Sequence, residues 1–346
     1  MKFVSLAVLL VLLSPVLALS LVGLWQGHDV VRGVYHLLRG PDVEILEARA
    51  NLPVVDQHRV SWLADLSDPE INESSGLAAS NHSNDFLWTI NDSGSEPVLF
   101  AVNLQGETLA RVAVTGAENL DWEALSSFVL DGTPYLAIGD VGDNFNWRRS
   151  VSVYLVPEPV IDTTSQGVSQ LSVEVAWQVR FTYPEGGLDS EAMAVDAVSA
   201  KILVLSKRER PNWLYSVPLL PADDASAMVA EPLQALAALP SPTEDEMDIH
   251  EALEEFLHLP SGMSVHQNSL LITTYKDAYL YTLQRSATGE IEALTDLVSI
   301  PLPSLGQREA ITFARDSNSE AYISKESMTA GRPADLFELK FSPDDD

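Results

Sequence analysis

The residues Asp121-Trp-Glu123-Ala-Leu125 and Gly139-Asp140-Val-Gly142-Asp143-Asn144 lie at the two ends of a predicted β-hairpin. Between them, the dipeptide Asp131-Gly132 is typical of a tight hairpin turn, and an apolar run follows at residues 134–138. Because hairpin strands run in opposite directions, the start of the first strand and the end of the second lie at the same end of the sheet. The stretch therefore predicts a β-sheet with acidic side chains gathered at one end.

The same unit recurs five times along the chain. Each copy begins with Ser or Glu, then Gly or Ala, then an apolar residue, and 15 to 17 residues later a β-rich run ends in a polar residue. The five signatures are Ser75-Gly76-Leu77, Glu123-Ala124-Leu125, Glu191-Ala192-Met193, Ser261-Gly262-Met263 and Glu309-Ala310-Ile311. The corresponding polar ends are Asn91, Asp140, Lys207, Lys276 and Lys325.

Further strands follow each hairpin. Third strands are predicted at residues 98–102, 151–156, 213–217, 278–283 and 336–341, and fourth strands at 109–114, 173–181, 233–239 and 297–300. Four-stranded antiparallel units in series are typical of a β-propeller. The sequence thus predicts an all-β fold, a five-bladed β-propeller, with six blades as the alternative because the second and third units are longer. A strand-like run at 59–66 is predicted to pair with residues 336–341 and close the ring.

The remaining segments are assigned from their composition. Residues 1–25 start with Met1-Lys2 and a long apolar run, which indicates an export signal peptide or an uncleaved membrane anchor. Residues 26–57 are predicted to be a spacer, 58–342 the propeller and 343–346 an acidic tail. Residues 244–258 are predicted to form a helix inserted on the face that carries Glu123 and Glu191.

Composition excludes several classes of function. The 346 residues carry a formal net charge of −30, which argues against a nucleic-acid or anionic-membrane surface, so membrane contact is expected only through the N-terminal apolar segment. The chain has no cysteine, which excludes disulfides and thiol chemistry. None of the seven histidines falls at a repeated channel position, and no Gly-x-Ser-x-Gly elbow occurs, so neither a His base nor a serine triad is predicted. We expect an exported monomer.

The repeat predicts one site at the channel mouth, because the signatures and the polar strand ends meet there. The candidate catalytic residues are Glu123, Glu191 and Glu309, and the candidate residues for an anionic ligand are Lys207, Lys276, Lys325 and Arg308. The candidate metal ligands are Asn91, Asp92, Asp140, Asp143 and Asn144. Carboxylate and amide oxygens of this kind suit Ca²⁺ without any His or Cys. Salt bridges between the glutamates and the lysines, and ordinary Gly-Asp turns, are the alternative.

Six stretches of the predicted propeller carry recognisable motifs: Glu73-Ser-Ser-Gly-Leu77, Trp88-Thr-Ile-Asn-Asp-Ser-Gly94, Asp121-Trp-Glu123, Gly139-Asp-Val-Gly-Asp-Asn144, Thr274-Tyr275 with Asp277-Ala-Tyr279, and Gln307-Arg-Glu-Ala-Ile311. These motifs resemble those of a largely uncharacterised group of exported bacterial β-propeller proteins. The resemblance extends over roughly residues 60–341. The layout is more distantly similar to gluconolactonase- and paraoxonase-like propellers and to phytase-like ones. That resemblance implies Ca²⁺ held by oxygen ligands at the channel mouth. It is a resemblance of architecture, and a fold alone does not determine function.

The sequence is therefore consistent with three hypotheses about the function of the propeller. In the first, the propeller is a Ca²⁺-dependent hydrolase of a phosphate ester or lactone, in which Ca²⁺ polarises the substrate oxygen, the lysines neutralise an anionic group and a Glu is the base. In the second, the same face binds a small molecule, glycan or peptide without catalysis. In the third, the channel is held together by salt bridges and has a structural role.

Overall fold

The computed structural model describes residues 54–55, 57–209, 211–221, 227–236, 239, 257–303, 308–325 and 333–342. The chain divides into two compact units, Met1–Glu44 and Ile45–Asp346, and every described residue belongs to the second. The signal or anchor at 1–25, most of the spacer, the helix predicted at 244–258 except for its last two residues, and the acidic tail lie outside the described residues. No helix occurs among the residues described, and so none there is long and apolar enough to span a membrane.

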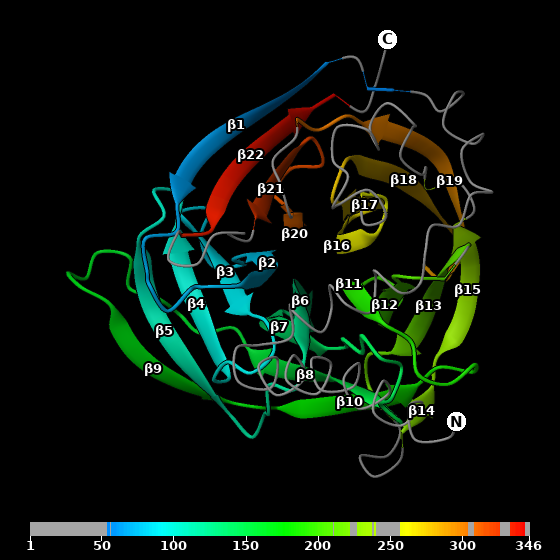
Figure 1. Ribbon diagram of the computed structural model, residues 1–346, viewed down its shortest axis with the longest axis horizontal. Coiled ribbons are helices and arrows are strands. Elements are labelled where there is room, and N and C mark those ends of the chain that lie inside the picture. The colour runs from blue at the N-terminus through cyan, green and yellow to red at the C-terminus, as the bar shows by residue number, and fades with distance from the viewer. Residues whose placement is uncertain are drawn as a thin grey trace, which may run out of the picture. The chain divides into compact units, whose positions relative to one another are not determined.

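The unit is a five-bladed β-propeller (Figure 1). The first strands of neighbouring blades pack against one another in a closed ring around the channel. These first strands are β2 (Ser74–Ala79), β6 (Trp122–Leu130), β11 (Ser190–Asp196), β16 (Pro260–His266) and β20 (Arg308–Phe313). The five-blade prediction is confirmed, and the six-blade alternative is wrong.

The other strands of each blade follow outward in order. Second strands are β3 (Phe86–Asn91), β7 (Thr133–Asp140), β12 (Lys201–Ser206), β17 (Ser269–Thr274) and β21 (Glu320–Lys325). Third strands are β4 (Val98–Asn103), β8 (Val151–Pro157), β13 (Asn212–Pro218), β18 (Ala278–Arg285) and β22 (Asp335–Phe341). Fourth strands are β5 (Thr108–Thr115), β10 (Trp177–Thr182), β15 (Glu231–Leu236), β19 (Ile291–Ile300) and β1 (His58–Asp65).

The ring closes as predicted. β1, from the start of the propeller, pairs antiparallel with β22 from its end, from His58 opposite Phe341 to Asp65 opposite Asp335. The hairpin turn between β6 and β7 is also as predicted, since Asp131 and Gly132 both have positive φ, at 51° and 80°.

One predicted strand is wrong. The sequence predicts that residues 173–181 form the fourth strand of blade two, but the structure divides them between β9 (Ser169–Glu174) and β10. β9 runs parallel to β5 and adds a fifth strand to blade one, whereas β10 pairs antiparallel with β8. The division between the two blades falls between Val175 and Ala176. Val175 N–H donates to Thr115 O of blade one, whereas Ala176 N–H donates to Leu155 O of blade two. The short β14 (Met228–Val229) likewise adds a strand beside β10.

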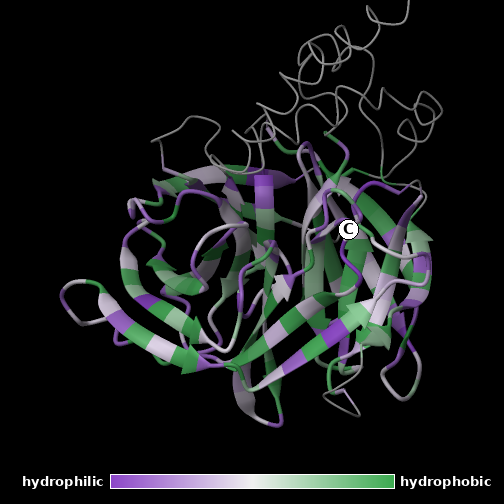
Figure 2. Cartoon of the chain, turned by 60° about the horizontal axis from the view of Figure 1, so that its bottom comes forward, coloured by the Kyte–Doolittle hydropathy of each residue, from purple (hydrophilic) through white to green (hydrophobic). Residues whose placement is uncertain are grey.

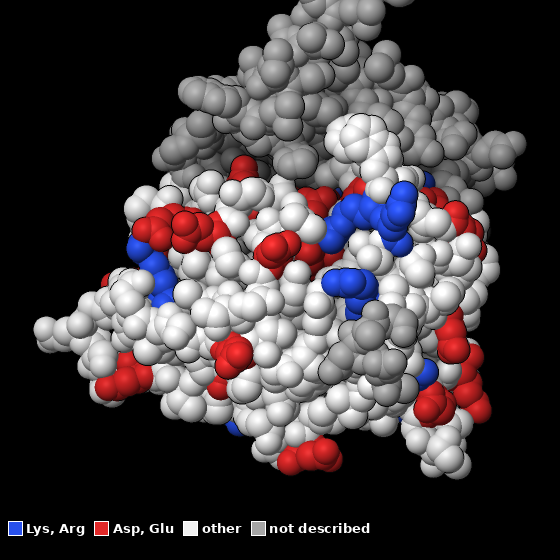
Figure 3. Space-filling model, turned by 90° about the horizontal axis from the view of Figure 1, so that it is seen from below, with Lys and Arg blue, Asp and Glu red and all other residues white. Residues whose placement is uncertain are grey.

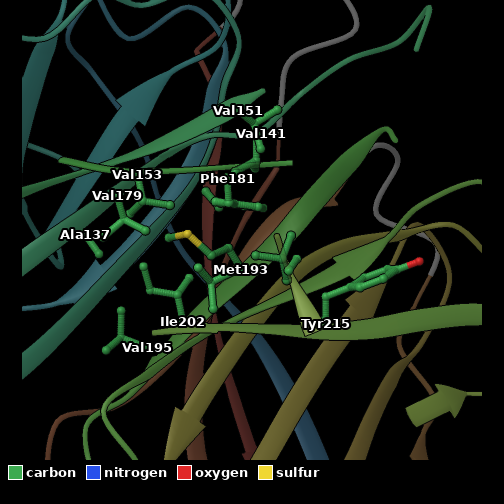
Figure 4. Packing of buried hydrophobic residues seen from close by; sticks show 14 of the residues in the cluster. Ala137, Val141, Val151, Val153, Val179, Phe181, Met193, Val195, Ile202 and Tyr215 are labelled. Atoms are coloured by element: carbon green, nitrogen blue, oxygen red, sulfur yellow. The ribbon is translucent and has the colours of Figure 1, made fainter. Parts of the chain in front are cut away.

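Burial explains the apolar runs of the inner strands. β2, β3, β11 and β20 are buried at every residue, because neighbouring blades cover both of their faces, whereas outer strands such as β5 and β10 alternate between buried and exposed positions. Figure 2 shows this alternation on the outermost strands. Five apolar clusters fill the five interfaces between blades. In Figure 4, Val153 and Phe181 of blade two lie close to Met193 of blade three.

Hydroxyl groups also join the inner strands at a repeated position, three residues after the start of the signature. Ser126 Oγ accepts from Val195 N–H of the next blade at 3.0 Å, and Ser264 Oγ accepts from Phe313 N–H at 3.1 Å. Thr312 Oγ1 accepts from Ala79 N–H at 3.3 Å, across the closure of the ring. These bonds satisfy backbone donors that first strands cannot pair within their own sheet.

Candidate functional site

A β-bulge interrupts every hairpin at its signature. In each blade, the first residue of the signature is left out of the pairing register with the second strand. The residues immediately before and after it do pair with that strand. These first residues are Ser75, Glu123, Glu191, Ser261 and Glu309. A bulge changes the direction of a side chain and is common beside functional sites. All five of these residues line one small, narrow cavity in the channel.

The Gly or Ala that follows each bulge lets the inner strands approach one another. A Cβ on Gly76 would lie 2.8 Å from Leu125 N, and one on Gly262 would lie 2.9 Å from Ile311 N. Both contacts are too short for a real side chain, so the small residue is required by packing. The channel is consequently narrow where the first strands meet.

Three carboxylates converge on the side of the channel formed by blades one and two. Asp92 follows the end of β3, and Asp121 and Glu123 flank the start of β6; one carboxylate oxygen from each lies within 4.8 Å of the others. Asp121 and Glu123 are buried, at 7% and 3% exposure, while Asp92 is half-buried. The structure therefore brings together Asp92 from the predicted metal ligands and Glu123 from the predicted catalytic residues. It adds Asp121, whose position two residues before Glu123 was the available signal.

Asp140 lies beside this cluster but has a cationic partner. Its Oδ1 accepts from Asp121 N–H at 3.0 Å and pairs with Arg148 Nη1 at 2.8 Å. Its Oδ2 is buried and accepts no hydrogen bond from the described residues. Burial raises the pKa of the Asp140 carboxyl, and the pairing with Arg148 offsets only part of that rise.

The other predicted metal ligands hold loops in place. The Asp143 carboxylate accepts from the backbone N–H groups of Trp147 and Arg148, at 2.8 and 2.9 Å. Asn144 Oδ1 accepts from Arg208 Nη2 at 2.7 Å, and Asn91 Nδ2 donates to Glu70 O at 2.6 Å.

Gly142 fits the loop after β7 against the carboxylate cluster. A Cβ at this position would lie 2.4 Å from Asp121 Oδ2 and 2.9 Å from Glu123 Cγ. Gly142 N–H also donates to Asp121 O at 3.2 Å. The second glycine of the Gly139–Asn144 motif is therefore explained by the close approach of backbone to carboxylate.

A buried polar network occupies the opposite side of the channel. Lys207 forms an ion pair with Glu191, and both side chains are almost wholly buried. Tyr275 Oη lies 3.2 Å from Glu191 Oε2 and 3.2 Å from Glu309 Oε2, and Lys207 Nζ lies 5.6 Å from the Tyr275 ring centroid. Two predicted catalytic glutamates thus meet through a tyrosine that sequence reasoning did not assign.

The remaining predicted ligand-binding cations have protein partners. Lys325 pairs with Asp335 at 3.2 Å, and Lys276 lies 4.0 Å from the Asp277 carboxylate. Arg308 is fully buried and donates to the backbone oxygens of Tyr275 and Lys276, at 2.5 and 2.8 Å. Burial lowers the pKa of Arg308 to about 10.

Charge at the surface is mixed in sign. On the side seen in Figure 3, Lys and Arg side chains lie next to Asp and Glu side chains. Arg148, on the loop after β7, pairs with Asp140, and no pattern of spacing in the sequence identified it as that partner.

Comparison with known proteins supplies similar architectures but no family. No protein-family model matches the sequence, and no curated protein does. Among solved structures, the chain is similar to the PQQ-bound aldose sugar dehydrogenase of Streptomyces coelicolor, with 11% identity, a TM-score of 0.42 and coverage of 84% of this chain and 100% of that one. It is also similar to Myxococcus xanthus glutaminyl cyclase, with 12% identity, a TM-score of 0.42 and coverage of 82% and 94%. The assignment as a five-bladed β-propeller therefore comes from the sheet topology of the chain itself.

Proposed function

We propose that the propeller binds Ca²⁺ at its channel mouth and uses that ion to bind a small or anionic ligand. The observation that carries this proposal is the convergence of Asp92, Asp121 and Glu123 within 4.8 Å. Three carboxylates at this separation repel one another, and a divalent cation between them removes that repulsion. Ca²⁺ takes about 6–8 oxygen ligands, so three carboxylates leave positions for water and for oxygens of a ligand.

The surroundings fit a hard cation. The donor set consists of oxygens alone, and the buried Oδ2 of Asp140, which accepts no hydrogen bond from the described residues, lies on the residue that binds Asp121 N–H. The backbone at Gly142 packs against Asp121 and Glu123, and Glu123 also lines the cavity in the channel. Asp92, Asp121 and Glu123 would hold the ion, which would supply a Lewis acid and an attachment point for ligand oxygens.

Hydrolysis of a phosphate ester or a lactone is the second candidate. It is favoured by Glu191 and Glu309, which line the same narrow channel as Glu123 and are both hydrogen-bonded to Tyr275. In that reaction a channel glutamate takes the proton of an attacking water. The test is release of product from an aryl phosphate and from a lactone, with and without Ca²⁺, in the wild type and in Glu309→Gln.

Calcium titration followed by thermal melting tests the cation site. At a Ca²⁺ concentration 100 times the Kd, a bound ion adds about 2.7 kcal/mol to the unfolding free energy, or roughly 5–10 °C in Tm. We expect Asp121→Asn to remove most of this increase. The matched control is Asp296→Asn, an exposed acid on β19 of blade four, which should keep the wild-type increase. A wild-type Tm that does not respond to Ca²⁺, or an equal response in Asp121→Asn, refutes the proposal.

Export is part of the same proposal. It is supported by the charged and apolar residues 1–25 and by the resemblance of the propeller motifs to those of exported bacterial propellers. Fractionation of a bacterial host that expresses the chain with and without residues 1–25 tests it. The full chain should be found outside the cytoplasm, and the shortened chain inside.

A further inference from the structure

The loop at residues 141–150, which starts at the proposed cation site, carries a half-buried Phe145 and an exposed Trp147. The rings of Phe145 and Trp147 are stacked, with centroids 4.8 Å apart and planes 26° apart. Trp147 is 80% exposed, whereas Trp88 and Trp122 in the interior are fully buried. An indole left in water gives up the stabilisation that its burial would bring, and its free face is open to a ligand.

The loop is nevertheless held in one conformation. The Asp143 carboxylate fixes the N–H groups of Trp147 and Arg148, and Arg148 Nη1 donates to Asp140 Oδ1 and to Gly142 O, both at 2.8 Å. Asn146 N–H donates to Asp143 O at 2.8 Å. The ring pair is therefore presented on an ordered loop, and a ligand that stacks on it does not first have to order that loop.

The same loop forms part of the wall of the cation site. It begins at β7, where Gly142 packs directly against Asp121 and Glu123, and it reaches Trp147 five residues later. One rigid segment thus carries both an apolar ring face and one side of the carboxylate cluster. A ligand that satisfies both has a flat apolar face and several oxygens on one molecule.

We propose that the ligand of this site is a carbohydrate, one of whose rings stacks on Trp147 while its hydroxyl groups complete the coordination of the cation. This inference rests on the proposed calcium site. A sugar ring has an apolar C–H face and vicinal hydroxyls, and hydroxyl oxygens are hard ligands of the kind Ca²⁺ takes. A purely aromatic ligand has an apolar face but no oxygens to coordinate the cation. Inorganic phosphate has such oxygens but no apolar face to stack on Trp147.

A glycan array and calorimetry with the retained glycans test the inference on the full chain. We expect glycans to be retained in Ca²⁺ and lost in EDTA. Trp147→Ala should weaken the Kd about tenfold or more, in line with the loss of one ring contact, while its calcium-dependent rise in Tm stays at the wild-type value. The matched control is Trp62→Ala, which removes a 57% exposed indole from β1 on another blade and should bind as the wild type does.

Each contrary result has a distinct meaning. If the Tm responds to Ca²⁺ but no glycan is retained, the carbohydrate inference is wrong and the calcium site stands. If Trp147→Ala binds glycans as tightly as the wild type, or if glycan binding survives EDTA, the joint use of ring and cation is overturned. If the Tm does not respond to Ca²⁺, the proposed function fails, and this inference fails with it.

Discussion

Removal of the Lys207 ammonium separates a structural ion pair from a ligand-binding lysine. Lys207 and Glu191 are 2% and 1% exposed, so in Lys207→Met the Glu191 carboxylate loses its ammonium partner in a site that water hardly reaches. Loss of one partner of a buried pair typically costs about 3–5 kcal/mol. For a domain of this size each kcal/mol corresponds to about 2–4 °C, so we expect the Tm to fall by roughly 10 °C.

The matched control is Lys325→Met. The Lys325 and Asp335 side chains are paired at 3.2 Å but are 26% and 23% exposed, so water screens the pair and its loss should cost about 1 kcal/mol or less. Urea denaturation at neutral pH and calorimetry measure both variants. The double variant Glu191→Met with Lys207→Met removes both charges and should be more stable than Lys207→Met alone.

Two results would refute this reasoning. If Lys207→Met costs no more than Lys325→Met, Glu191 does not depend on the ammonium. If the double variant is less stable than Lys207→Met, the hydrogen bond between Glu191 and Tyr275 matters more than the charge pair, since the double variant removes that bond as well.

Two further predictions concern other buried carboxylates. Glu158, which accepts hydrogen bonds from Ser80 Oγ at 2.6 Å, Trp88 Nε1 at 2.9 Å and two groups of Asn81, joins blades one and two. Glu158→Gln places an amide donor against these donors and should lower the unfolding free energy by about 3 kcal/mol in urea denaturation, whereas Glu107→Gln on the surface should change it by less than about 1 kcal/mol. Asp140 has a pKa raised by burial, so the folded state holds its proton longer than the unfolded state, and the contribution of Asp140 to stability declines as the pH rises above about 3.8. Asp140→Asn should therefore be better tolerated at pH 7 than at pH 4 in the absence of Ca²⁺, and a preference for pH 4 in urea titrations would contradict the burial argument.

The sequence by itself determined the blades, because the residue patterns that specify each blade are local. The signature, the Asp131-Gly132 turn and the buried run that follows them act over fewer than 20 residues, and they predict the hairpin irrespective of its neighbours. The repeat then fixes the ring, since residues 59–66 and 336–341 are the two strands left to pair with each other. The level of the site in the channel also follows from the repeat.

The tertiary structure alone decided which groups meet. The alternation of Val173, Val175, Trp177 and Val179 runs unbroken through the division between β9 and β10, because a strand keeps the same period whichever blade it pairs with. The partners of charged side chains were hidden for a related reason. A sequence gives only the separation of two residues along the chain. Tyr275 contacts Glu191 from a different blade, and Arg148 contacts Asp140 because the loop between them folds back. The bulge at Glu123 turns its carboxylate toward Asp92 and Asp121. The direction of this side chain is set by packing between the inner strands of different blades. Contacts between blades produce no regular spacing along the sequence, so sequence analysis does not detect them.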